Sequence, residues 1–261
     1  MSLMGQLGLI RRKVVSSMCA RRVPLGGRGP IVSFTFDDFP RSALTIGGAI
    51  LKRYGARGTY YAAMGLMNGS NHLGDQFRHE DLDTLLRDGH ELASHTFGHV
   101  SCRAVSSSSF AQEVDKGRKA IESLTGRADF GNFAYPFGDI TLNTKRLVGP
   151  GLASSRSIWG GLNAEEVDLN LLRANSLYGD GAMSEQVREL ILENERQKGW
   201  LIFYSHDVSS TPSRYGCTPD LLDFAVSFAA QRRGTIATVA EVVSDLVAPG
   251  RQKQHLSEAI S

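Results

Sequence analysis

The chain of 261 residues is 41% hydrophobic, and its 29 basic and 27 acidic residues give a net charge of +2. This composition allows a sizeable buried core in one large domain and gives no global argument for a nucleic-acid partner. Residues 1–29 hold six basic residues and no acid. We expect a solvated basic arm there, with weak contact to an anionic membrane surface as the alternative.

We expect neither a secretory signal nor a transmembrane segment. After Arg11–Lys13 the apolar stretch VVSSMCA is interrupted by serines and followed by more arginines, whereas a signal needs about 7–15 apolar residues. No window approaches the roughly 18 apolar residues of a membrane-spanning helix. The cysteines, Cys19, Cys102 and Cys217, are odd in number and form no C-x-x-C motif. Reduced thiols and a cytoplasmic location are therefore predicted.

The first half of the chain alternates strand and helix patterns. Residues 31–36 (IVSFTF) are a β-branched and aromatic run, which predicts a strand, and the helix that follows is expected to end at Gly55. Ser109 and Gln112 have the spacing of a capping box, so a long helix is expected to begin there. The predicted strands are 31–36, 58–64, 90–94, 129–136 and 152–158, and the predicted helices are 42–55, 80–89 and 106–126.

The second half continues this alternation. Residues 200–205 (WLIFYS) are almost wholly apolar, as expected for a strand buried on both faces. Thr218 and Pro219 provide an N-cap and a first helical residue for the next helix. The predicted elements are helix 184–199, strand 200–205, helix 218–234, strand 235–239 and a last helix at about 240–247.

This order predicts one α/β domain over residues 30–248, followed by a polar tail at 249–261. About seven strands that alternate with helices indicate a parallel sheet, most economically a closed or nearly closed (β/α) barrel. An open, doubly wound sheet is the alternative. In either case the working residues belong at the carboxyl ends of the strands.

Several predicted strands end on residues that can bind metal or transfer protons. The first ends on Asp37 and Asp38, the third leads into HTFGH with His95 and His99, and the strand at 200–205 leads into His206. If HTFGH forms a helical turn, its two histidines can face one ion, and a carboxylate from another strand would complete an open, catalytic type of metal site. A site with two histidines and one carboxylate would also suit a non-haem iron oxygenase, but the second aspartate and the further histidine fit hydrolysis better.

The adjacent carboxylates can divide two tasks. One can ligate the ion while the other acts as a base towards water, and the positive ion compensates their mutual repulsion. The residues alone do not say which aspartate does which. The alternative interpretation is a cap or a solvated turn before the helix that begins near residue 42.

These residues resemble the polysaccharide deacetylases of carbohydrate esterase family four, over about residues 30–240. The resemblance implies a distorted barrel and a single-ion hydrolase that removes N- or O-acetyl groups from sugars. It also implies that Asp37 is the general base, that Asp38, His95 and His99 bind the metal, and that His206 is the general acid. The matching motifs are TFDD (35–38), HTFGH (95–99), FAYPFG (133–138) and FYSHD (203–207).

The resemblance also indicates residues that contact or orient the substrate. The backbone near Tyr135, in the same motif as Pro136, would polarise the acetyl carbonyl, and Tyr204 lies where the family usually has an apolar residue against the acetyl methyl group. The third motif often has an arginine that orients the catalytic aspartate, but this chain has Ala134 there. Arg173 is the first candidate to replace it and Arg156 the second.

Another departure concerns the general acid. No aspartate is legible for the fourth motif, which usually tunes the acid; the stretch SRSIWGG offers only Trp159. Asp207 is adjacent to His206 but, as a neighbouring strand residue, is expected to point away.

Zinc is the preferred ion, although two imidazoles and a carboxylate also suit cobalt, manganese or nickel. The expected substrate is an acetylated oligosaccharide, polysaccharide or sugar precursor. The alternatives are an amidohydrolase acting on a non-sugar C–N bond, since fold alone does not fix the substrate, and an inactive carbohydrate-binding relative. Loops 68–72 and 215–220 are expected to border the substrate groove.

Overall fold

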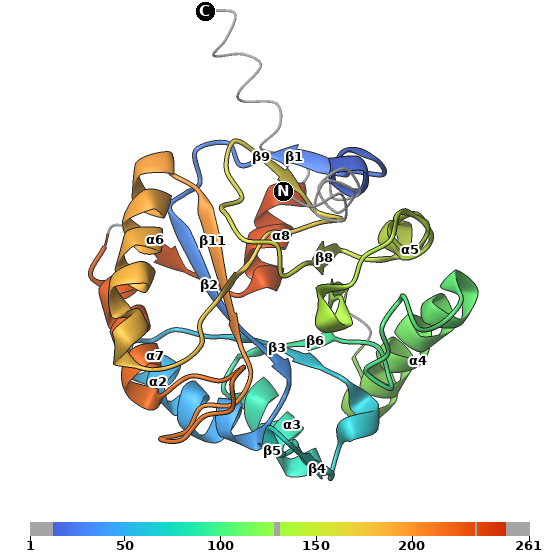
Figure 1. Ribbon diagram of the computed structural model, residues 1–261, viewed down its shortest axis with the longest axis horizontal. Helices are drawn as coiled ribbons and strands as arrows, with labels where there is room; N and C mark the ends of the chain where they lie inside the picture. Colours follow the sequence, from blue (N-terminus) through green and yellow to red (C-terminus); the bar gives the residue numbers. More distant parts are fainter. Residues whose placement is uncertain (1–12, 128–130, 233, 249–261) are drawn as a thin grey trace, which may run out of the picture.

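The computed structural model describes residues 13–127, 131–232 and 234–248. Its centre is an eight-stranded sheet in the order β10–β11–β2–β3–β6–β7–β8, with β12 paired to β2 (Figure 1). All of its strand pairings are parallel. The strands are β2 (Ile31–Asp38), β3 (Thr59–Ala62), β6 (Glu91–Ser94), β7 (Asn132–Ala134), β8 (Ser154–Arg156), β10 (Asn175–Ser176), β11 (Trp200–Ser205) and β12 (Thr235–Ile236).

The sheet curls, and the segment that leads into β10 returns to the edge of β8. Arg156 and Leu172 form a parallel bridge. The amide of Leu172 donates to Ser155 O at 2.8 Å, and the amide of Ser157 donates to Leu172 O at 2.9 Å. The distorted (β/α) barrel of about seven parallel strands is therefore confirmed, and the open-sheet alternative is wrong.

Helices surround the strands in Figure 1, with α2, α6 and α7 on one side and α4 and α5 on the other. The main helices are α2 (Ala49–Arg53), α3 (His79–Arg87), α4 (Ser107–Thr125), α5 (Leu142–Val148), α6 (Ser184–Gln197), α7 (Pro219–Ala230) and α8 (Val239–Val247). A π-helix (Ala43–Gly48) precedes α2, and short 3-10 helices occupy Met64–Leu66, Pro136–Gly138, Gly149–Gly151 and Gly181–Met183. Within the described residues, no helix is long and apolar enough to cross a membrane.

The capping residue of one helix differs from the prediction, and one helix was not predicted. Helix α4 is capped by Ser106, three residues before the predicted Ser109: the amide of Ser109 donates to Ser106 Oγ at 3.1 Å. Helix α5 was not predicted. Its start is fixed by Thr141, whose hydroxyl accepts from the amide of Thr144 at 3.1 Å.

Alternation along β2 separates the outer core from the barrel interior. Val32, Phe34 and Phe36 pack in the main hydrophobic cluster together with residues of the surrounding helices. Successive strand residues point to opposite faces, so Thr35 and Asp37 point into the barrel. The barrel interior is thus partly polar, and the Asp37 side chain lies at the carboxyl end of β2.

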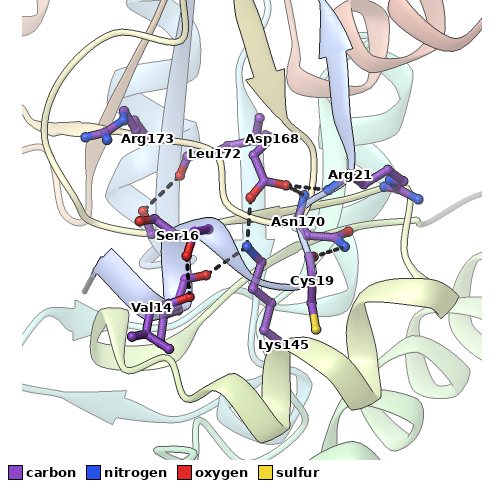
Figure 2. A network of polar contacts seen from close by, with 12 residues as sticks. Val14, Ser16, Cys19, Arg21, Lys145, Asp168, Asn170, Leu172 and Arg173 are labelled. Carbon is purple, nitrogen blue, oxygen red and sulfur yellow. Dashed lines mark hydrogen bonds and ion pairs between the residues drawn. The ribbon is translucent and has the colours of Figure 1, made fainter. Parts of the chain in front are cut away.

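The described part of the N-terminal segment contacts the barrel through buried Val15 and Leu25, while its basic residues Lys13 and Arg22 are exposed. Strand β1 (Arg22–Pro24) pairs antiparallel with β9 (Glu166–Asp168). Figure 2 shows Lys145 reaching from α5 to this segment: its Nζ donates to Val15 O at 3.0 Å and to Asp168 Oδ2 at 2.8 Å. The Lys145 side chain is fully buried. Arg11, Arg12 and the tail at 249–261 lie outside the described residues.

Candidate active site

Each of the five residues predicted to carry the chemistry lines one cavity of about 490 Å³ at the carboxyl ends of the strands: Asp37, Asp38, His95, His99 and His206. Asp37 and Asp38 end β2, His95 and His99 follow β6, and His206 follows β11. The sheet order separates β2 from β6 by one strand only, and β11 is the other neighbour of β2. The parallel sheet therefore brings together residues that are far apart in the chain.

The backbone at the end of β2 explains how adjacent aspartates face the same cavity. Asp37 keeps strand geometry and points into the barrel, whereas Asp38 and Phe39 have φ values of 64° and 70°. Left-handed backbone is uncommon for residues other than glycine. This turn directs the Asp38 carboxylate back into the cavity beside Asp37.

Asp38, His95 and His99 form a cluster whose candidate ligand atoms all lie within 4.8 Å of one another. Oδ1 of Asp38 is 3.5 Å from Nε2 of His95 and 3.1 Å from Nε2 of His99. The two histidines lie on a loop, in which Thr96 and His99 have φ values of 61° and 51°. They do not lie on the helical turn that the sequence analysis considered.

The chemistry of this cluster fits a bound cation. Nδ1 of His95 lies 2.8 Å from Ala134 O and must donate to it, and burial lowers the pKa of His95 to about 3. Its neutral ring therefore turns the lone pair of Nε2 towards Asp38 Oδ1, a buried atom with no hydrogen-bond donor among the described residues. Burial also raises the pKa of Asp38 to about 6. Two electron-rich atoms that face each other without a proton are suited to share a metal ion.

Asp37 is held by a buried arginine. Nη2 of Arg156 lies 2.5 Å from both carboxylate oxygens, and its guanidinium stacks over the rings of Tyr61 and Tyr204 at 4.9 and 5.1 Å. Burial alone would raise the pKa of Asp37, but Arg156, together with the neighbouring histidines, holds that pKa below its ordinary value. Asp37 is therefore an ionised carboxylate in a fixed orientation.

This contact corrects the choice of arginine. Arg173, the first candidate, is exposed, and its Nη1 donates to Gly160 O at 3.0 Å. Arg156, the second candidate, makes the contact to Asp37. Arg156 is paired with Ala134 in the register of β7 and β8. The guanidinium thus comes from the strand next to the position where the family often has its arginine.

His206 is oriented by a backbone carbonyl. Its Nδ1 donates to Tyr215 O at 3.1 Å, so Nε2 is the nitrogen left for a substrate. Asp207 points away, as expected: its carboxylate accepts from the amide of Ser213 at 2.8 Å and from the hydroxyl at 2.5 Å. Asp207 therefore holds the loop that contains the carbonyl partner of His206.

The other predicted substrate contacts are divided between the cavity and the core. Tyr204 lines the cavity. Tyr135 and Pro136 are buried without lining it, and the amide of Tyr135 already donates to Arg156 O at 3.1 Å. This amide is therefore engaged in strand pairing, and the expectation that the backbone near Tyr135 polarises an acetyl carbonyl stays a prediction. Phe137, the next residue along the chain, lines the cavity in its place and is 61% exposed.

Sequence reasoning missed several lining residues. One of them is Tyr178, whose ring centroid lies 5.4 Å from that of Tyr204 and 6.1 Å from those of His206 and Tyr215. Its segment, SLYGD, has no motif that would have identified it. The other lining residues are Leu73, Gly138, Ile158 and Arg214, together with His72 and Tyr215 from the loops expected to border the groove.

A parallel β/α barrel with an Asp–His–His cluster, a second carboxylate and a further histidine at its strand ends has the residue types that a hydrolase site with one metal ion would need. The family comparison agrees with this class. Residues 26–149, just under half of the chain, match the family described as polysaccharide deacetylase, which confirms the predicted resemblance to carbohydrate deacetylases over this part of the chain. No curated protein matches the chain.

Solved structures share the fold at low sequence identity. A putative polysaccharide deacetylase from Mycobacterium smegmatis is 18% identical with a TM-score of 0.61, over 86% of this chain and 93% of the other. The chitin deacetylase of the fungal pathogen Colletotrichum lindemuthianum is 18% identical (TM-score 0.58; 82% and 88% covered). A family 4 acetyl xylan esterase from Clostridium thermocellum, in complex with a cobalt ion, is 20% identical (TM-score 0.58; 82% and 90% covered).

Proposed function

We propose that the protein removes N- or O-linked acetyl groups from a carbohydrate, with one divalent ion held by Asp38, His95 and His99. The observation that carries this proposal is the juxtaposition of a hydrogen-bond-deficient Asp38 oxygen and two imidazole nitrogens beside a second, arginine-held carboxylate. Nitrogen and carboxylate ligands suit zinc best, and cobalt, manganese or nickel can replace it. When bound, the ion supplies Lewis-acid chemistry that polarises the acetyl carbonyl and acidifies water.

Asp37 and His206 divide the proton transfers. Asp37 is ionised and accepts a proton as water adds to the acetyl carbon. His206 donates a proton from Nε2 to the leaving nitrogen or oxygen, so that the C–N or C–O bond breaks and acetate is released. The carbonyl of Tyr215 keeps the ring in the orientation that leaves Nε2 available.

The substrate proposal stays with an acetylated oligosaccharide, polysaccharide or sugar precursor. The structures similar to this chain include those titled chitin deacetylase and acetyl xylan esterase, which supports both N- and O-acetyl substrates. We also propose a cytoplasmic location, because all three cysteines are unpaired thiols and two of them are buried.

Acetate release tests the proposal. Metal-free and zinc-reconstituted protein are compared on acetylated chitooligosaccharides, acetylated xylan and nucleotide-linked N-acetylhexosamines. We expect metal-dependent release that Asp37→Asn abolishes, and loss of tight zinc binding in His95→Gln but not in the matched variant of an exposed histidine, His79→Gln. Tight metal binding with no release from any sugar would favour the amidohydrolase alternative, and absence of metal binding would contradict the site.

A further inference from the structure

The residues that line the cavity follow the strand order around the whole barrel. Each of the seven strands on the path from β10 to β8 has a lining residue at its carboxyl end or in the connection that follows it. In that order they are Tyr178 after β10, His206 after β11, Asp37 in β2, His72 in the loop after β3, His95 after β6, Phe137 after β7 and Ile158 after β8. These lining residues, called the wall below, therefore surround the cavity as a ring and do not form the two opposite sides of an open groove.

Two loops meet on one side of this ring. The hairpin of β4 (Ser70–Asn71) and β5 (Gly74–Asp75) carries His72 at its turn, and the loop after β11 carries Tyr215. The rings of His72 and Tyr215 lie 6.1 Å apart at an interplanar angle of 76°, an edge-to-face contact. This contact joins the two loops and makes the wall continuous there.

Internal hydrogen bonds hold both loops. In the hairpin, Asn71 Oδ1 accepts from the amide of Leu73 at 2.8 Å and from Nε2 of Gln76 at 3.1 Å. In the other loop, the hydroxyl of Ser213 accepts from the amide of Tyr215 at 3.1 Å and itself donates to Asp207. The two rings are thus presented by ordered turns.

The wall is also continuous on the side where β8 approaches the segment before β10. A Cβ atom on Gly138 would lie 2.1 Å from Ile158 Cγ1, so the loop after β7 packs directly on the loop after β8. The amide of Ala174 donates to Trp159 O at 3.1 Å and ties the loop after β8 to the chain that leads to β10 and Tyr178. Among the described residues, a lining residue or a contact between lining loops thus follows each strand end around the cavity.

We propose that this cavity takes the terminal sugar of a chain, or a short acetylated saccharide, end-on, and does not admit the middle of a polymer. The inference rests on the proposed deacetylase function and specifies its substrate. A polymer bound by an internal unit must leave the site in two directions, which a ringed cavity does not allow. Its volume of about 490 Å³ lies within the roughly 300–1,000 Å³ of small-molecule sites.

The position of deacetylation tests the proposal. The acetylated substrate that reacts fastest is supplied in graded lengths, from disaccharide to hexasaccharide and polymer, and the deacetylated unit is located by tandem mass spectrometry. We expect release at one terminal unit, with kcat/KM at least about tenfold above that for internal units. Release from internal units at comparable rates would overturn the end-on proposal alone. Absence of acetate from every length would refute the deacetylase function and this inference together.

A variant of the wall gives an independent result. His72→Ala removes the ring that joins the hairpin to the loop of Tyr215, and we expect the ratio of internal to terminal release to rise severalfold. His79→Ala removes an exposed histidine outside the cavity and is expected to leave this ratio unchanged. An unchanged ratio in His72→Ala would overturn the assignment of selectivity to this wall.

Discussion

Replacement of Arg156 should show whether activity depends on the orientation of the Asp37 carboxylate, the proposed base, and not only on its presence. Arg156 is fully buried, its Nη2 contacts both oxygens of Asp37 at 2.5 Å, and its plane stacks between Tyr61 and Tyr204. Arg156→Lys keeps the positive charge but removes the planar guanidinium that makes these contacts. Arg156→Met also removes the charge and leaves Asp37 as an unpaired buried carboxylate.

The two variants are expected to affect different quantities: the rate in Arg156→Lys and the free energy of unfolding in Arg156→Met. In Arg156→Lys the carboxylate loses its fixed position, and misplacement of a reacting group by about 1 Å costs roughly 10²-fold in rate. We expect kcat to fall by about this factor with little change in KM. In Arg156→Met, loss of one partner of a buried ion pair should lower the free energy of unfolding by about 3–5 kcal/mol.

Arg173 provides the matched control. It was the other candidate for the same role, but it is exposed and donates to Gly160 O. Arg173→Lys should retain kcat and change the free energy of unfolding by no more than about 0.5 kcal/mol. The measurements are initial rates of acetate release and urea unfolding followed by circular dichroism. Equal loss of kcat in Arg173→Lys and Arg156→Lys would refute the reasoning.

Three further predictions concern support of the site and of the fold. Burial lowers the pKa of His90 to about 4, so protons bind the unfolded chain first, and this histidine should lower stability by roughly 2 kcal/mol from pH 7.5 to 5. In urea unfolding, the pH-dependent loss should be smaller by this contribution in His90→Gln, while His95, whose pKa is also lowered, continues to contribute; a loss as large as in the parent protein would contradict the assignment. Lys145→Met removes the ion pair between fully buried Lys145 and half-buried Asp168, which keeps the amides of Arg21 and Asn170 as donors, and should cost about 1–3 kcal/mol by urea unfolding; partial recovery in Lys145→Met/Asp168→Asn is the control. Asp207→Asn weakens the loop that orients His206 and should lower kcat about tenfold at constant KM; a rise in KM alone would argue against a positioning role.

The residues that lie at strand ends could be predicted from the sequence to lie close together. Parallel strands place their carboxyl ends at one edge, so Asp37, His95 and His206 could be grouped from their positions relative to apolar runs. The cavity contains all three. The same reasoning could not assign the aspartates to their roles, because the direction of each carboxylate depends on the backbone turn at Asp38 and not on the strand pattern.

Residues that reach the site from a neighbouring strand could be named from the sequence only as alternatives, as Arg156 was after Arg173. Arg156 reaches Asp37 because β7 and β8 pair in the register that sets Ala134 beside Arg156, and register is not visible in one sequence. Arg173 was preferred by its local context alone. Likewise, Tyr215 contributes a backbone carbonyl to His206, and any residue type can supply that atom, so no residue pattern could have identified it.

The strained backbone explains why local rules failed specifically at this site. Among the non-glycine residues with positive φ, Asp38, Thr96, His99 and Phe137 lie in the segments that form the cavity. Each such position costs of the order of 1–3 kcal/mol and persists only where the surroundings enforce it. A helical turn at HTFGH would relieve the strain at Thr96 and His99, whereas the observed loop keeps it and places both imidazoles beside Asp38. The chain therefore departs from its local backbone preferences at this cluster, which local sequence patterns do not reveal.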